Sequence, residues 1–278
     1  MIFNLLKNKK QEGYTLVEIL VVIAIIGILS SVTFVAFSSA REKSRMSTAK
    51  MFEVNKLVSA RNYLISEWKF EEGTGNIAYN SSSDDNGVFV GSPSWSNETY
   101  DTSTSKKSLY FPFGSYIKLN QILGIMDSNF SISMWIKTIV STGQAYIVYN
   151  AGNILGYRFG IGGGSLIFLI GNDSSYVETN CTTKTVNDDK WHHVAISFDR
   201  ENKKVTCFID GKEEGYKDLN SGYYGGSTEY LTKIGSGYDN KYQGNLDNVR
   251  IFTSSLSASD IQKLYAEESV QRKLAEAN

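Results

Sequence analysis

The feature that most constrains this chain is an uncharged apolar run near its start. Residues 19–40 contain no charged residue and no proline, and this length exceeds the ~20 apolar residues that a helix needs to cross a bilayer. In lipid an isolated segment must satisfy its own backbone hydrogen bonds, so the run predicts a helix. Lys7, Lys9 and Lys10 precede it, and the positive-inside rule then places the first residues in the cytoplasm and the rest of the chain outside.

One carboxylate, Glu18, stands at the edge of this run. An intramembrane carboxylate costs about 2.5–3.5 kcal/mol unless it finds a partner. Thr15 and Val22, on the same helical face, carry no charge. A cut after Gly13 would create an α-amine on Tyr14 about one helical turn away. The amine of a neighbouring subunit would then neutralise Glu18 in the membrane or in an assembled fibre.

The string Gly-Tyr-Thr-Leu-Val-Glu at residues 13–18, followed by the apolar helix, resembles the prepilin motif of type IV pilins and pseudopilins. The resemblance covers about residues 1–66. It implies that a prepilin peptidase cuts between Gly13 and Tyr14 and methylates Tyr14, and that Glu18 serves assembly with other pilin subunits. An ordinary signal anchor or cleaved signal peptide is the alternative, but it leaves Glu18 unexplained and lacks a small-x-small cleavage site.

The chain divides into four predicted parts. These are a leader at 1–13, a long membrane and fibre helix at 14–66, a β-sandwich at 67–268 and a polar tail at 269–278. The helix is expected to be continuous because no proline occurs before Pro93. This organisation predicts a single-pass protein of the bacterial inner membrane whose C-terminal domain lies outside the cytoplasm, and which then enters a pilus or reaches the cell surface.

The texture changes after Trp68 to short β-rich segments separated by Gly, Asn, Asp and Ser clusters, which indicates an all-β sandwich. Alternation is clear in two consecutive segments, where the inward residues are Val194, Ile196 and Phe198, then Val205, Cys207 and Ile209. The last segment, residues 257–268, has a cap region and an apolar helical face.

Several motifs in this part, at residues 68–75, 130–136, 191–195, 208–211 and 244–252, resemble the laminin G-like, concanavalin A-like jelly-roll family over about residues 64–267. The predicted fold class is therefore a long N-terminal α-helix followed by an all-β concanavalin A-like jelly roll. Such modules include lectins, glycosidases, protein binders and spacers, so the resemblance predicts the fold and not the function.

Glycosidase chemistry of the retaining kind needs two carboxylates about 5–5.5 Å apart. The Glu-x-Asp arrangement that provides them on a strand does not occur in the sequence. Adjacent acidic pairs, such as Asp188-Asp189, would point to opposite faces of a strand. We therefore expect that the protein is not an enzyme. The paired His192 and His193 likewise face opposite sides and do not predict a metal site.

A calcium ion is implied by the jelly-roll resemblance. Related domains hold Ca²⁺ with oxygen ligands from an early acidic turn and a late strand, and Ca²⁺ prefers such hard ligands. The matching residues here are Glu71, Glu72 and Asp247, with Asn80 where the family usually has Asp. The alternative is that Asp247 bonds to backbone amides at a strand end.

Ligand contacts are sought among tyrosines in glycine-rich loops that are expected to be exposed. The candidates are Tyr223, Tyr224, Tyr238 and Tyr242. Exposed aromatic faces stack on sugar rings, but they equally suit contacts with a neighbouring pilin.

The two cysteines, Cys181 and Cys207, allow one disulfide in an exported domain if both side chains lie on one face with their Cα atoms within about 7 Å. Otherwise Cys207 is a small core residue, as its alternation suggests.

The formal net charge of −1 gives no global field that would favour nucleic acid. The sequence thus predicts a type IV pilin-like minor pilin or adhesin whose sandwich binds a glycan or another surface ligand. The alternative is a structural pseudopilin of a secretion or DNA-uptake machine, with the sandwich as a packing module.

Overall fold

The computed structural model describes residues 16–27, 61–100, 106–121, 123–141, 143–152, 155–172, 175–219, 231–235 and 242–276. The chain forms two compact units, Met1–Asn55 and Lys56–Asn278. In the first unit residues 16–27 are helical, and their side chains are exposed. Among the residues that the structure describes, no helix is both long enough and apolar enough to cross a membrane.

Most of the predicted helix at 14–66 lies outside the described residues. Its predicted end is wrong, because helical residues 61–62 lead into strand β1 (Leu64–Trp68). The reason is pairing: β1 runs antiparallel to β16 (Gly244–Phe252), with Trp68 opposite Val249.

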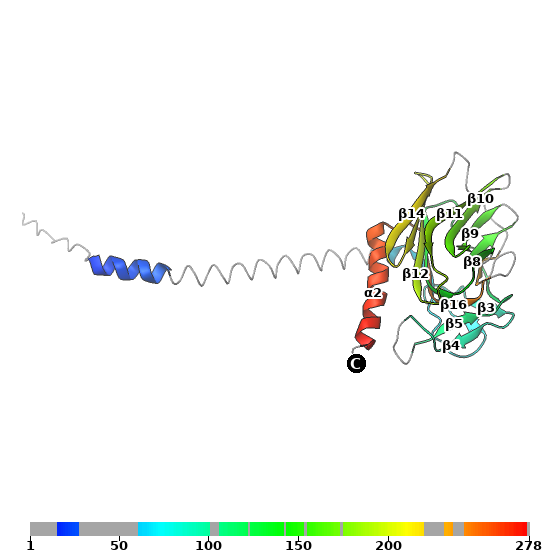
Figure 1. Ribbon diagram of the computed structural model, residues 1–278, viewed down its shortest axis with the longest axis horizontal. Coiled ribbons are helices and arrows are strands. Elements are labelled where there is room, and N and C mark those ends of the chain that lie inside the picture. The colour runs from blue at the N-terminus through cyan, green and yellow to red at the C-terminus, as the bar shows by residue number, and fades with distance from the viewer. Residues whose placement is uncertain are drawn as a thin grey trace, which may run out of the picture. The chain divides into compact units, whose positions relative to one another are not determined.

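The second unit is a sandwich of two antiparallel sheets (Figure 1). Sheet A contains, in spatial order, β14 (Lys212–Asp218), β13 (Lys204–Ile209), β12 (His192–Asp199), β7 (Phe130–Thr138), β16, β5 (Ser108–Phe111) and β4 (Ser94–Ser96), with β1 beside β16. Sheet B contains β11 (Tyr176–Thr185), β10 (Ser165–Gly171), β9 (Gly156–Gly162), β8 (Gln144–Ala151), β15 (Lys233–Ile234), β6 (Tyr116–Leu119), β3 (Gly87–Val90) and β2 (Ile77–Ala78). The predicted all-β jelly roll is confirmed.

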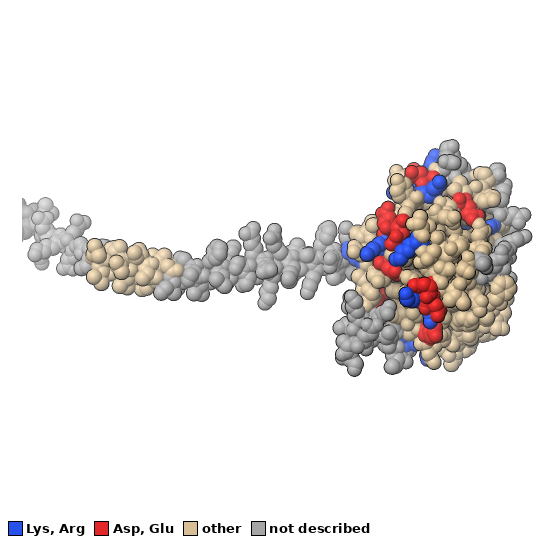
Figure 2. All heavy atoms as spheres, viewed as in Figure 1, with Lys and Arg blue, Asp and Glu red and all other residues tan. Residues whose placement is uncertain are grey.

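The surface of the sandwich carries charges of both signs. On the face seen in Figure 2, the described acidic and basic side chains are intermingled. The surface of the sandwich also carries ion pairs, such as that of Lys137 Nζ with Glu98 Oε2 at 2.8 Å. Such exposed pairs each contribute little to stability.

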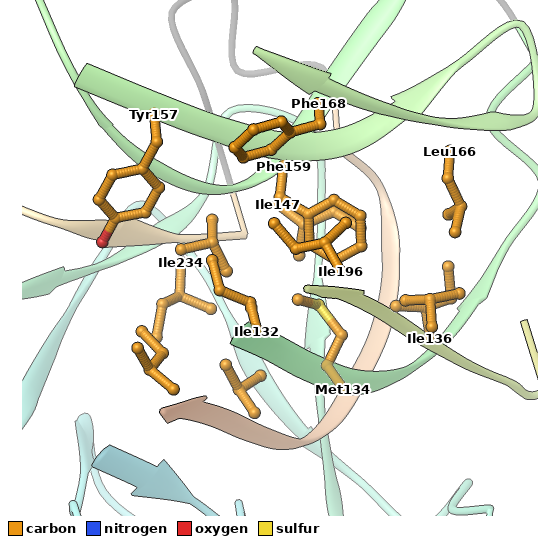
Figure 3. Close-up of a cluster of buried hydrophobic side chains, with 14 of the residues drawn as sticks. Ile132, Met134, Ile136, Ile147, Tyr157, Phe159, Leu166, Phe168, Ile196 and Ile234 are labelled. Atoms are coloured by element: carbon orange, nitrogen blue, oxygen red, sulfur yellow. The ribbon is translucent and has the colours of Figure 1, made fainter. Parts of the chain in front are cut away.

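The main hydrophobic core lies between the sheets, where alternate residues of every long strand meet (Figure 3). Ile132, Met134 and Ile136 of β7 point inward from sheet A, and Phe159 and Phe168 point inward from sheet B. The alternation predicted for β12 and β13 is also present, since Val194, Ile196 and Phe198 pair with Ile209, Cys207 and Val205 and all six are buried.

Cys181 of β11 and Cys207 of β13 form a disulfide with a Cα–Cα distance of 5.8 Å. Because β11 belongs to sheet B and β13 to sheet A, the bond joins the two layers directly. Gly215 on β14 lies close to this joint: a Cβ at Gly215 would come within 2.2 Å of the Cys181 carbonyl oxygen. The two sheets therefore meet tightly along this edge.

A C-terminal helix, α2 (Ala258–Glu276), covers the outer face of sheet A and lies near β14 (Figure 1). Its residues Ile261 and Leu264 complete a second apolar cluster with Ala195, Phe208, Phe252 and Leu256. The helix extends well beyond the predicted end at residue 268, so most of the segment expected to be a polar tail is helical.

Candidate ligand-binding face

Two of the residues predicted to direct processing, Gly13 and Tyr14, lie outside the described part of the chain. Glu18 lies in the helix at residues 16–27, and its side chain is exposed. The roles of these three residues therefore stay predictions from the motif.

The early acidic turn predicted to bind calcium is engaged in contacts within the protein. Glu71 Oε1 lies 2.9 Å from Lys106 Nζ, and Glu71 Oε2 accepts a hydrogen bond from the Lys107 backbone N–H. Glu72 Oε1 accepts a bond from the Tyr79 backbone N–H at 2.7 Å. Asn80 Oδ1 accepts bonds from three backbone N–H groups, which organise the loop that follows it.

Asp247, the fourth predicted ligand, is almost fully buried and accepts a bond from Thr99 Oγ1 at 3.1 Å. Burial raises the pKa of Asp247 well above its usual range, and the nearby Glu71 and Glu268 raise it further. Within the described ranges, no group of three or more His, Cys, Asp or Glu side chains is arranged to hold a metal ion. The four residues do not fit a shared calcium site in these contacts, and calcium binding stays a prediction.

The tyrosine candidates have different outcomes. Tyr223, Tyr224 and Tyr238 lie outside the described residues. Tyr242 was expected in an exposed loop, and this is wrong, because its side chain is completely buried. Its hydroxyl donates to the Asn245 carbonyl at 2.9 Å, so the ring is held in the main core at the start of β16.

A different set of side chains forms a straight row across the outer face of sheet B. The backbone register aligns, strand by strand, Val88 of β3, Lys118 of β6, Lys233 of β15, Tyr149 of β8, Arg158 of β9, Leu169 of β10 and Glu178 of β11. We call this set the sheet B row. Its members face outward because their chain neighbours, such as Ile117, Ile234 and Phe159, point into the core.

Two of the three cations of the row lie against tyrosine rings. Lys233 Nζ is 5.0 Å from the Tyr116 ring centroid and 5.9 Å from that of Tyr149. Arg158 Cζ is 5.0 Å from the Tyr149 centroid and 5.5 Å from that of Tyr146. These distances fall in the range of cation–π attraction. The middle of the row, with the neighbouring Tyr116 and Tyr146, is therefore a mixed aromatic and basic surface.

The hydroxyl of Tyr146 stays protonated at physiological pH. Burial raises the pKa of Tyr146 to about 12, with Glu178 adding to the effect. The protonated hydroxyl donates to Gln144 Oε1 at 3.0 Å. Tyr146 thus supplies a hydrogen bond and a π-face and does not neutralise the nearby Arg158.

Exposure differs along the row. Arg158 and Tyr149 are buried, and Arg158 Nη2 donates to the Gly152 carbonyl at 2.6 Å. Lys118 is exposed, and Lys233 is half-buried. Among the cations of the row, those on β6 and β15 are therefore the ones that a ligand can reach.

One local pattern in the sequence indicates this face. In β9, Arg158 stands between Tyr157 and Phe159, and both of these aromatic residues face the core. Alternation alone would have placed Arg158 on the outer face. The position of Lys233 had no such signal, because β15 is a two-residue strand whose register is set by pairing with β6 and β8.

Two sequence families match the chain. Residues 113–262, more than half of the chain, match the concanavalin A-like lectin/glucanases superfamily, and residues 8–34 match the prokaryotic N-terminal methylation motif. The chain therefore belongs to the concanavalin A-like lectin/glucanases superfamily, and it joins a prepilin-type N-terminus to a lectin-like domain. No curated protein sequence matches it.

Similar solved structures share the sandwich. The binding domain of paraclostridial mosquitocidal protein 1 has a TM-score of 0.60 and 19% identity, over 75% of this chain and 53% of that chain. Domain 4 of an extracellular GH43 arabinanase from Geobacillus stearothermophilus, solved with arabinotriose, has a TM-score of 0.59 and 18% identity, over 73% of this chain and 98% of that one. Botulinum neurotoxin type C, whose cell entry depends on interaction with two ganglioside molecules, has a TM-score of 0.54 and 18% identity, over 76% and 52%.

At these identities the likeness shows the fold alone. The chain spans about half the length of the two toxin structures.

Proposed function

We propose that the protein is a minor pilin or adhesin, in which a prepilin-type N-terminus carries a glycan-binding jelly roll to a pilus or the cell surface. The observation that carries the proposal is the union, in one chain, of the methylation motif and a lectin-like sandwich with an accessible aromatic and basic face. Domains of this fold that bind arabinotriose or belong to ganglioside-dependent toxins support it by analogy.

The N-terminus would act as in other prepilins. A prepilin peptidase cuts after Gly13 and methylates Tyr14, and Glu18 then pairs with the amine of a neighbouring subunit. Before assembly the protein is held in the bacterial inner membrane by its apolar helix, with the sandwich outside the cytoplasm. The partners are thus the peptidase, other pilin subunits and a surface glycan, and no catalytic step is involved.

Processing is tested by expressing the full chain with a prepilin peptidase and measuring the mass of the product. The wild type should lose residues 1–13, Gly13→Glu should stay uncut, and Glu18→Ala should be cut but absent from fibres. A wild-type chain that keeps Met1 under these conditions would contradict the pilin assignment.

Display of a lectin is tested with a glycan array probed with residues 56–278. This unit has its own core, and its fold matches a domain of the arabinanase over nearly that domain's whole length. Binding to a restricted set of glycans is the expected result. A structural pseudopilin predicts that no glycan binds while the full chain still enters fibres.

A further inference from the structure

We infer that the exposed end of the sheet B row, formed by Lys118 and Lys233, together with the adjacent Tyr116, binds an acidic glycan whose sugar carries a carboxylate or a sulfate. The inference rests on the proposed function and narrows it. It assigns the ligand class and places the binding site on β6 and β15, away from the loop tyrosines suggested by the sequence.

Two lysines, Lys118 and Lys233, form a like-charge pair at the exposed end of the row. Lys118 and Lys233 are direct register partners on β6 and β15, so their side chains project from the same face of the sheet. Like charges directly opposite each other on neighbouring strands are destabilising. Within the described part of the chain neither lysine is in an ion pair, and the one carboxylate of the row, Glu178, lies on β11 at its far end. An anionic group placed between the two lysines would remove this repulsion.

An aromatic ring lies beside the lysines. Tyr116 is half-buried on the outer face of β6, two residues before Lys118, with Lys233 Nζ 5.0 Å from its ring centroid. A sugar ring that stacks on Tyr116 brings a carboxylate or sulfate substituent within reach of both ammonium groups. Charge-assisted hydrogen bonds of this kind are stronger than neutral ones.

The charge distribution of the chain favours an acidic glycan over nucleic acid as the ligand. The chain has 28 Lys and Arg against 29 Asp and Glu, so it has no net positive field to attract a long polyanion. The positive charge is local to the row, and an aromatic residue accompanies it. A short acidic saccharide fits this arrangement better than a duplex, whose binding grows with the number of phosphates contacted.

The test uses pairs of probes, each an acidic saccharide and a neutral counterpart. Residues 56–278 are titrated with sialyllactose and lactose, polygalacturonate and its methyl ester, and dextran sulfate and dextran. We expect binding to the acidic member of at least one pair, with a clear preference over its neutral partner and a loss of affinity on adding salt.

Single variants locate the site. Lys118→Gln and Lys233→Gln should each weaken binding about tenfold, which corresponds to about 1.4 kcal/mol. Lys204→Gln is the matched control, because Lys204 Nζ also lies over a tyrosine, 4.0 Å from the Tyr216 centroid, but on sheet A. This control variant should bind like the wild type.

Each other outcome overturns the inference in a distinct way. Equal binding to acidic and neutral members, or binding to neutral glycans alone, would refute the ligand class and leave the proposed lectin function standing. Acidic binding that survives both lysine substitutions would refute the site. Duplex DNA that binds as tightly as the best glycan, with the same lysine dependence, would show a general polyanion surface. Failure of every glycan on the array would remove the lectin function itself.

Discussion

The outer faces of the two sheets both carry basic side chains, but only on sheet A does the described part of the chain pair one of them with buried carboxylates. Beneath α2, on sheet A, the half-buried Arg250 forms ion pairs with the buried carboxylates of Glu67 and Glu268. On sheet B, Lys118 and Lys233 are register partners, and within the described residues neither is in an ion pair. A buried charge that lacks a partner is strongly destabilising, whereas an exposed charge costs little. The contrast separates a face that stabilises the fold from a face available for binding.

The charges on sheet A form a connected group. Arg250 Nε donates to Glu67 Oε1 at 2.7 Å, and Arg250 Nη1 and Trp135 Nε1 both donate to Glu268. Burial opposes ionisation of Glu67, yet Arg250 holds the pKa of this carboxyl below its usual value. The group joins β1, β16, β7 and α2, so it fastens the start and the end of the sandwich to one another.

The largest expected effect is at Arg250. Arg250→Met should lower the free energy of unfolding of residues 56–278 by about 3–5 kcal/mol, because the buried Glu268 loses its Arg250 partner and the buried Glu67 keeps only the exposed Lys69. The matched change on sheet B, Arg158→Met, should cost less, about 1–2 kcal/mol, because it removes cation–π contacts and hydrogen bonds, among them the bond to the Gly152 carbonyl. Urea denaturation measures both. Equal losses would mean that the two faces do not differ as described.

The disulfide comes second. The double variant Cys181→Ala, Cys207→Ala should lower the free energy of unfolding by about 3 kcal/mol, since the bond closes a loop with a sequence separation of 26. Denaturation with and without reductant should show the same difference in the wild type and none in the variant. Two reactive thiols in unfolded, unreduced protein would instead leave Cys207 as a core residue without a bond.

The third prediction concerns His193, which lies under α2 against Trp135 and Tyr265. Burial, with Arg250 adding to it, lowers the pKa of His193 to about 3. The unfolded chain takes up a proton at this residue below about pH 6.5, and the folded chain does not. The free energy of unfolding therefore decreases as the pH is lowered, by about 2 kcal/mol between pH 7 and pH 5. His193→Leu should remove most of this decrease, as measured by urea denaturation at several pH values.

His192, the adjacent residue, provides the opposite sign as a control. A hydrogen bond to Asp210 raises the pKa of His192, and Asp188 adds to the effect. Its contribution is therefore complete below the unfolded pKa and is lost as the pH rises through the folded pKa. His192→Gln should change how the free energy of unfolding depends on pH above pH 6.5, and it should leave the decrease below pH 6.5 unchanged. If His192→Gln removed the decrease below pH 6.5, burial of His193 would not be its cause.

The smallest effect is expected at Asp247. Burial raises its pKa, so this carboxyl favours the folded state below its unfolded pKa and opposes it as the pH rises. In chelator at pH 7, Asp247→Asn should raise the Tm by a few degrees. If calcium binds, millimolar Ca²⁺ should instead raise the Tm of the wild type and not that of the variant. If neither calcium nor chelator changed the Tm of the wild type, calcium binding at this site would be excluded.

Much of the fold could be predicted because local pattern and tertiary structure agree. The inward residues of β12 and β13 follow a strict alternation, and the prepilin string is contiguous. Trp135, by contrast, lies on the face of β7 that α2 covers, where its ring stacks on that of Tyr265, and not on the face between the sheets. A period of two separates the faces of a strand without saying which element covers each face.

The candidate site was less predictable for a related reason. The sheet B row joins seven strands that are distant in sequence, and its register depends on pairings that no local pattern encodes. The disulfide is similar, since alternation turned Cys207 inward but could not bring Cys181 from the other sheet. Tyr242 showed the reverse error, because a glycine-rich neighbourhood suggested exposure at a residue that closes the core.

The most direct measurement is an amide hydrogen-exchange footprint of residues 56–278, with and without a saturating amount of the tightest-binding acidic glycan. The account predicts slower exchange in β6, β15 and β8, and unchanged exchange in β1, β16 and α2. Protection centred on α2 and the strands beneath it, with β6 and β15 unaffected, would contradict the assignment of binding to sheet B and of stability to sheet A.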